Sequence, residues 1–171
     1  NNDKLDCDGE SYEIVKNIPR FVDGDNYSAA FGLQWNTFKK TQFDSYTGKP
    51  ITEERLEKAL GQELTTLRGK KVLEAGSGAG RFTEILLKYG AVVYSFDFSS
   101  AVEANYQNNM PNDRLTLFQA DIQKIPFSSD FFDVVVCLGV LQHTPNTKRS
   151  LAELTRVLKP NGLLTCDHYK Y

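Results

Sequence analysis

The chain has 171 residues, of which 40% are hydrophobic and 25% charged, and its formal net charge is −2. This balance is typical of one soluble globular domain with room for a small additional segment. The weak negative charge argues against a surface that binds the phosphate backbone of nucleic acids. No apolar run reaches the roughly eighteen residues of a membrane-spanning helix and no signal peptide is visible, so we expect a cytoplasmic protein without a membrane span.

The first segment, residues 1–20, is a polar lead-in. Its single cysteine is Cys7, and Lys4 stands where the partner in a C-x-x-C pair would be. A zinc knuckle needs paired cysteines. We therefore predict no metal site from these residues.

Residues 21–69 form a cap that is rich in aromatic side chains. Phe31, Trp35 and Phe38 have the spacing of one helical face, which predicts a short helix. Composition predicts a further helix over residues 52–67. The cap either packs against the rest of the fold or forms a lid over a ligand cleft.

From residue 70 to residue 171, apolar segments alternate with amphipathic ones. Uninterrupted runs such as 134–136 indicate strands that are covered on both faces, as in parallel sheets. The alternation predicts an α/β fold: a three-layer αβα, doubly wound, mostly parallel sheet of Rossmann-like type. The predicted strands are residues 71–75, 91–96, 114–120, 132–138 and 163–169.

Three helices are predicted between these strands. Residues 81–89 carry apolar side chains at helical spacing and end at Gly90. Ser99 is placed to cap a helix over residues 100–108. Another must end before Pro160, and its apolar face consists of Leu151, Leu154, Val157 and Leu158.

The stretch "LEAGSGAGRF", residues 73–82, places a glycine loop between the first strand of the core and its first helix. Ligands of open α/β sheets lie beyond the carboxyl ends of the strands, so this loop is expected to form one wall of a site. Asp97 closes the second strand, 19 residues after Gly78, where a carboxylate can accept hydrogen bonds from both ribose hydroxyls. Asp121 ends the third strand, which suits contact with an adenine ring.

Glu74 stands two residues ahead of the glycine loop. Beside a pyrophosphate, a carboxylate at 4–6 Å would cost roughly 3–4 kcal/mol at an effective dielectric constant near 20. The same carboxylate would favour a nucleoside that carries an ammonium group and a sulfonium centre, as S-adenosylmethionine does. Alternatively, the carboxylate of Glu74 bonds a backbone amide.

Four ordered motifs together resemble the class I S-adenosylmethionine-dependent methyltransferases. The first two are "VLEAGSGAGRFT" and "SFDFS"; the third is "ADIQKIPF", and "FDVVVCLGVLQHTPN" with "LTRVLKPNGLL" completes the set. The resemblance covers about a hundred residues, and it is closest to the small-molecule branch typified by enzymes of ubiquinone and menaquinone biosynthesis.

The resemblance implies roles for individual residues. The glycine loop would line the methionyl part of the cofactor, with Glu74 near its amino group. The acids at the next two strand ends would bind ribose and adenine, and the loop after the fourth strand would form the floor of the site. The implied cofactor-binding residues are Glu74, Gly76, Ser77, Gly78, Asp97, Phe98, Asp121, Ile122, Leu138, Gly139 and Val140.

The chain departs from the family pattern in three ways. It ends at Tyr171, directly after the fifth strand, where the family's sheet continues with an antiparallel pair, so we expect a truncated core. The lead-in "CDGESYEIVKNIPRFV" resembles the end of a zinc-ribbon-like segment that precedes some bacterial methyltransferases, here with one cysteine. Gln142 occupies a position where relatives often carry histidine.

The expected function is transfer of a methyl group to an O, N or C atom of a small molecule. His143, just beyond the fourth strand, is the candidate general base because its ordinary pKa suits proton removal at neutral pH. The alternative is that His143 only supports its loop. Two other functions stay open: an NAD(P)-dependent oxidoreductase, and a non-catalytic cofactor-binding module. The sequence does not fix the oligomeric state.

Overall fold

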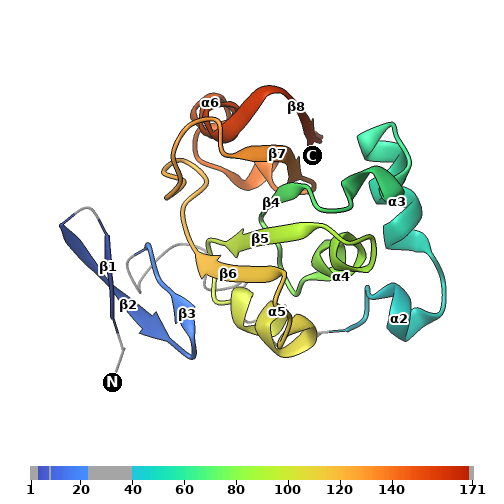
Figure 1. Cartoon of the computed structure of the whole chain (residues 1–171), viewed down its shortest axis with the longest axis horizontal. Helices are drawn as coiled ribbons and strands as arrows, with labels where there is room; N and C mark the ends of the chain where they lie inside the picture. The colour runs from blue at the N-terminus through green and yellow to red at the C-terminus, as the bar shows by residue number, and fades with distance from the viewer. Residues whose placement is uncertain (1–3, 8, 23–39, 170–171) are drawn as a thin grey trace.

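The computed structural model describes residues 4–7, 9–22 and 40–169. The lead-in forms a small antiparallel sheet of three strands in the order β1-β2-β3. These strands are β1 (Lys4–Cys7), β2 (Glu10–Val15) and β3 (Ile18–Pro19). Figure 1 shows this sheet at one end of the molecule, beside strand β6 of the larger sheet.

The described part of the cap contains α2 (Asp44–Thr47), α3 (Ile51–Leu60) and the 3-10 turn η1 (Leu64–Leu67). The single helix expected over 52–67 is therefore wrong, because Gly61 adopts φ 65° and ends α3. At the other end of α3, the Asp44 carboxylate accepts the N–H groups of Thr52 and Glu53, each at 2.9 Å. The helix expected around Phe31, Trp35 and Phe38 lies outside the described residues.

The core is a parallel sheet in the order β6-β5-β4-β7-β8, which confirms the predicted fold class. Strand β8 begins earlier than expected, at the residue after helix α6, so Leu158 belongs to the strand and not to the helix. The strands are β4 (Lys71–Ala75), β5 (Val92–Asp97), β6 (Leu115–Gln119), β7 (Phe132–Cys137) and β8 (Leu158–Cys166).

Helices cover both faces of this sheet (Figure 1). Helices α3, α4 (Arg81–Lys88) and α5 (Val102–Asn109) lie on one side, and α6 (Thr147–Val157) lies on the other. Helix α5 begins two residues later than predicted, since Ser99 instead accepts the N–H of Ala101 at 3.1 Å and closes the turn before it. A short 3-10 turn, η2 (Leu141–His143), follows β7.

Alternate residues of the strands point to opposite faces and so build two cores. On β4, Val72 belongs to the core under α3, α4 and α5, whereas Leu73 belongs to the core under α6. Val134 and Val135 of β7 divide in the same way. The continuous apolar runs in the sequence thus reflect burial on both faces. Within the described residues, no helix has the length and apolar character needed to cross a bilayer.

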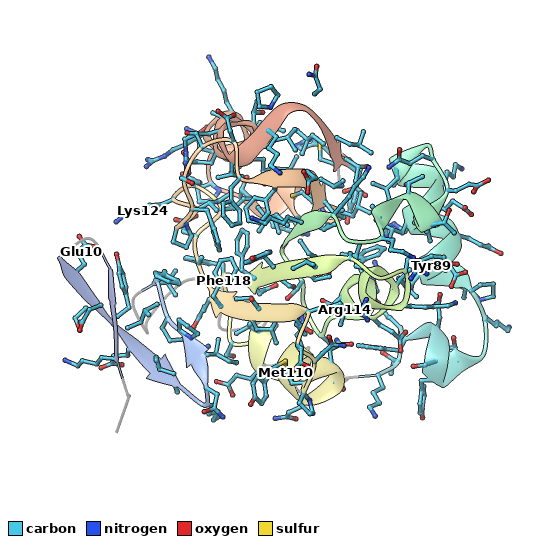
Figure 2. All side chains as sticks on the ribbon, in the orientation of Figure 1. Glu10, Tyr89, Met110, Arg114, Phe118 and Lys124 are labelled. Atoms are coloured by element: carbon cyan, nitrogen blue, oxygen red, sulfur yellow. The ribbon has the colours of Figure 1, made fainter. Side chains whose placement is uncertain are left out.

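The small N-terminal sheet is joined to the edge of the core at β6. The N–H of Phe21 donates to the carbonyl of Gln119 at 2.8 Å, and Arg20 forms a parallel bridge with Gln119. The rings of Phe21 and Phe118 meet edge to face with centroids 6.1 Å apart. Figure 2 shows Phe118 on β6, on the side of the core where the small sheet lies.

Candidate active site at the carboxyl edge of the sheet

Strand order reverses between β4 and β7, and in open α/β sheets this is where ligands bind. The strand register brings the carboxyl ends together, with Ala75 beside Phe96 and Asp97 beside Gln119. The loops after β4, β5, β6 and β7 therefore leave the same edge of the sheet. These loops contain all the sequence-predicted site residues except Glu74, which is in β4, and Asp97, which ends β5.

The glycine loop after β4 uses its amide groups inside the protein. The N–H groups of Gly76 and Ser77 both donate to the carbonyl of Phe96 at 2.9 Å. The N–H of Gly78 donates to Oδ2 of Asp97 at 2.8 Å. A loop that binds phosphate needs such groups free to point at the anion. Here these three amides already hold the loop against the end of β5.

Asp97 is the centre of a compact hydrogen-bond arrangement. Its Oδ2 accepts from Gly78, and its Oδ1 accepts both the N–H of Ser99 at 2.8 Å and the Ser99 hydroxyl at 2.7 Å. A carboxylate offers about four acceptor positions, so Oδ2 keeps capacity for a further donor. Burial raises the pKa of Asp97 above its ordinary value, against the lowering effect of the bonds from Ser99 and Gly78.

The side chain of Glu74 is buried beneath helices α4 and α5, deeper inside the protein than the sequence suggested. Its carboxylate accepts the Thr83 hydroxyl and, at 2.8 Å, the Ser95 hydroxyl. Asn105 of α5 donates to these hydroxyls at 2.9 and 3.2 Å. The alternative of a backbone-amide partner is wrong: both partners of Glu74 are side chains. Its remaining atom, Oε1, is buried and has no hydrogen-bond partner.

The environment of Glu74 disfavours its charge. The residue is 2% exposed, and burial raises its pKa to about 7, partly opposed by the two hydroxyl bonds. Asp97 raises this pKa further, and Arg81 lowers it. Near neutral pH the side chain is therefore poised between its acid and its carboxylate.

The loops after β4 and β7 touch at Gly76. This glycine has φ 80°, and a Cβ atom added there would lie 2.3 Å from Cγ2 of Val140. The next residue back, Gly139, is held by Asp167, whose Oδ1 accepts the Gly139 N–H and whose Oδ2 accepts from Arg55 of α3 at 2.8 Å. The two loops therefore form one packed unit on either side of the switch point.

We expect Gly76→Ala to destabilise the fold by at least about 1 kcal/mol more than Gly61→Ala. Both glycines have positive φ, at 80° and 65°, but the added methyl meets nothing within 4 Å at Gly61. The two variants share the backbone cost and differ in the contact with Val140. Urea unfolding of both variants measures the difference. Equal losses of unfolding free energy in the two variants would show that Val140 can move away from the added methyl group without cost.

The remaining sequence-predicted residues are placed as follows. Leu138 is 8% exposed and directly follows β7. Ile122 is 7% exposed, and Asp121 lies two residues beyond the end of β6 rather than at it, with Oδ1 accepting the N–H of Gln123 at 2.8 Å. His143 is exposed at the end of η2.

Several residues near this edge were not predicted from the sequence. Arg55 and Asp167 come from segments 112 residues apart and meet only in the fold, so no local pattern could have indicated them. Gln142 carries a side-chain amide whose nitrogen and oxygen are both buried without a hydrogen-bond partner. For Gln142, the departure from the family pattern was the one feature of the sequence that could have indicated it. Among the described residues, no group of three or more His, Cys, Asp or Glu side chains is placed to hold a metal ion.

The family profile of a methyltransferase domain matches residues 73–166, more than half of the chain, and spans every loop of this edge. The chain belongs to this methyltransferase family. Its resemblance in sequence to class I methyltransferases is thereby confirmed.

Curated relatives of this methyltransferase domain include enzymes named for quinone biosynthesis. A ubiquinone biosynthesis O-methyltransferase of Coxiella burnetii is 31% identical over 105 residues, which are 60% of this chain and 45% of that protein. A demethylmenaquinone methyltransferase of Clavibacter sepedonicus is 31% identical over 111 residues, 64% of this chain and 45% of that protein. The match thus spans less than half the length of these relatives.

The fold is shared with solved structures. A 1.15 Å crystal structure from Methanococcus maripaludis, described as that of an S-adenosyl-L-methionine-dependent methyltransferase, superposes with a TM-score of 0.65 at 21% identity. The superposition covers 85% of this chain and 67% of the chain from Methanococcus maripaludis. At that identity the likeness establishes the Rossmann-like fold alone.

Proposed function

We propose that this methyltransferase domain binds S-adenosylmethionine at the carboxyl edge of its sheet and transfers the methyl group to a small molecule. One observation supports the choice of cofactor. The N–H groups of Gly76, Ser77 and Gly78 in the glycine loop already donate to Phe96 and Asp97. A pyrophosphate would find those donors already bonded, and the carboxyl group of Asp97, which bonds the loop at Gly78, would not favour its negative charge.

The residues at this edge fit a sulfonium nucleoside. In this proposal Asp97 accepts from one ribose hydroxyl through the free capacity of Oδ2, with Phe98 beside the adenine. Asp121 and Ile122 contact the adenine on its other side. Residues 76–78 line the methionyl part, and residues 138–140 form the floor. The buried, unpartnered Oε1 of Glu74 supports an acceptor role toward the ammonium group, directly or through a water.

When bound, this cofactor supplies a methyl group that is already activated by the positive sulfur. The protein's task is then to align the nucleophile of the acceptor and exclude water. We propose an acceptor with an oxygen, nitrogen or activated carbon nucleophile. The two relatives support a quinone-related ring as the type of acceptor, because one is named for ubiquinone biosynthesis and the other for demethylmenaquinone.

Ligand-dependent stabilisation tests the cofactor. We expect S-adenosylhomocysteine at about 100 times its Kd to stabilise the protein by about 2.7 kcal/mol, seen as a rise in unfolding temperature. NAD at the same concentration should give no shift. Stabilisation by NAD and not by S-adenosylhomocysteine would replace this proposal by the oxidoreductase alternative.

His143 provides a test of proton removal. We expect His143→Ala to lower kcat by on the order of 100-fold for an acceptor that must lose a proton, with the cofactor Kd unchanged. His168→Ala is the matched control, since it removes an exposed histidine two residues beyond the end of β8. Steady-state kinetics with labelled cofactor measures both variants. If kcat of His143→Ala equals that of the control, His143 only supports its loop.

A further inference from the structure

The small N-terminal sheet makes a polar connection to the candidate cofactor site. Arg20 follows β3 directly, and its side chain is 10% exposed. Its Nη1 donates to Oε1 of Gln119 at 2.8 Å. Gln119 is itself 8% exposed and ends β6, directly beside Asp97 in the register of the sheet. A guanidinium from the lead-in is therefore buried against the strand that borders the site.

Gln119 connects Arg20 to the loop after β5. Its Nε2 donates to the carbonyl of Phe98 at 2.8 Å. Phe98 is the residue after Asp97, so the bonded carbonyl belongs to the backbone that positions the proposed ribose and adenine contacts. Because Gln119 accepts from Arg20 and donates to Phe98, its amide orientation is fixed from both sides.

The same guanidinium also holds the helix that follows this loop. Nη2 of Arg20 donates to Oε1 of Glu103 at 2.9 Å. Glu103 lies in the first turn of α5, where a negative charge is favourable. Residues 98–101 are thereby fixed at both ends, through Gln119 on one side and Glu103 on the other. A second basic residue, Lys16, also donates to Glu103, but its side chain is 67% exposed.

We propose that Arg20 is a positioning residue for the cofactor: acting through Gln119 and Glu103, it holds the loop after β5 so that Asp97 and Phe98 meet the adenosine. This inference rests on the proposed function and adds a role for the N-terminal sheet. The sheet is anchored for that role by Ile18, which is fully buried in the core, and by the Phe21 bond to Gln119.

The test compares ligand affinity with stability. Arg20→Met removes the guanidinium and keeps an apolar stem. We expect it to weaken binding of S-adenosylhomocysteine about tenfold by calorimetry, at a temperature well below the unfolding midpoint. The same factor should apply to 5′-methylthioadenosine, because that probe retains the adenosine and lacks the amino acid part. Lys16→Gln, the control on the exposed side of Glu103, should leave both affinities unchanged.

Gln119→Leu removes the connecting amide while leaving the Arg20–Glu103 ion pair, and it should weaken both probes to a similar degree. The double variant should then lose less than the product of the two single losses, because the residues act in one chain. A lower unfolding temperature with unchanged Kd for both probes, in either single variant, would overturn the positioning role. A wild-type protein that binds neither probe would instead overturn the proposed function.

Discussion

Asp97→Ala should weaken binding of S-adenosylhomocysteine by on the order of 1.5–3 kcal/mol, about 10-fold to 150-fold in Kd. The carboxylate is proposed to accept from the ribose, and it also accepts from Gly78 and Ser99. Its loss removes the proposed ligand contact and one of the three bonds that hold the glycine loop against the end of β5. Isothermal titration calorimetry measures the change.

Two comparisons separate these effects. Asp113→Ala removes an exposed acid from the loop before β6 and should leave the Kd unchanged. Adenosine and 2′,3′-dideoxyadenosine should differ in affinity for the wild type and not for Asp97→Ala, since the ribose hydroxyls have then lost their acceptor. A variant that still distinguishes the two nucleosides as strongly as the wild type would contradict the assignment of Asp97 to the ribose.

Glu74 should make stability depend on pH in the direction opposite to that of an ordinary ion-paired acid. Its pKa is about 7 in the folded protein against a reference of 4.5, so the folded state holds the proton more tightly. Its contribution is therefore fully present below pH 4.5 and is lost as the pH rises through about 7. The loss amounts to about 3 kcal/mol.

Glu74→Gln isolates this contribution from that of other acids. Asp97, with a raised pKa, acts in the same direction, whereas Glu53, Asp133 and Glu153 have lowered pKa values and act oppositely. The stability of the variant relative to the wild type should rise between pH 5 and pH 8 and then level off. Denaturant titrations at several pH values measure it. A relative stability that stays flat over this range would show that Glu74 titrates normally.

Cofactor binding should respond to the same proton. A ligand with an ammonium group and a sulfonium centre favours the carboxylate, so it should release a proton near pH 7. The affinity of the wild type for S-adenosylmethionine should then increase from pH 6 to pH 8, and that of Glu74→Gln should not. Calorimetry in buffers of different ionisation enthalpy counts the proton directly.

The core of the fold could be predicted because its signals are local. Continuous apolar runs such as residues 134–136 require two covered faces, and the structure divides them between two cores. The glycine spacing, with Asp97 at the next strand end, located the switch point. Element ends were less accurate: Gly61 interrupts the helix expected over 52–67, and Leu158 opens a strand. The first depends on the positive φ of Gly61, and the second on the pairing of Leu158 with Phe132 of β7.

The side-chain environment of the site could not be predicted to the same degree. Alternation along β4 places Glu74 on one face, but its neighbours Thr83 and Asn105 come from two helices that only the fold brings together. The sequence of the lead-in indicated still less about its structure and contacts. Its three strands are short and carry many charges, and the contact of Arg20 with Gln119 joins residues 99 apart. Such contacts have no signature in a single sequence.

The close approach of Gly76 and Val140 has a consequence for redesign of the proposed acceptor site. The side chain of Val140 lies directly against Gly76, so a bulkier residue at 140 would press on the proposed cofactor loop as well as on the proposed floor of the site. Libraries that aim at new acceptors should therefore keep valine at 140.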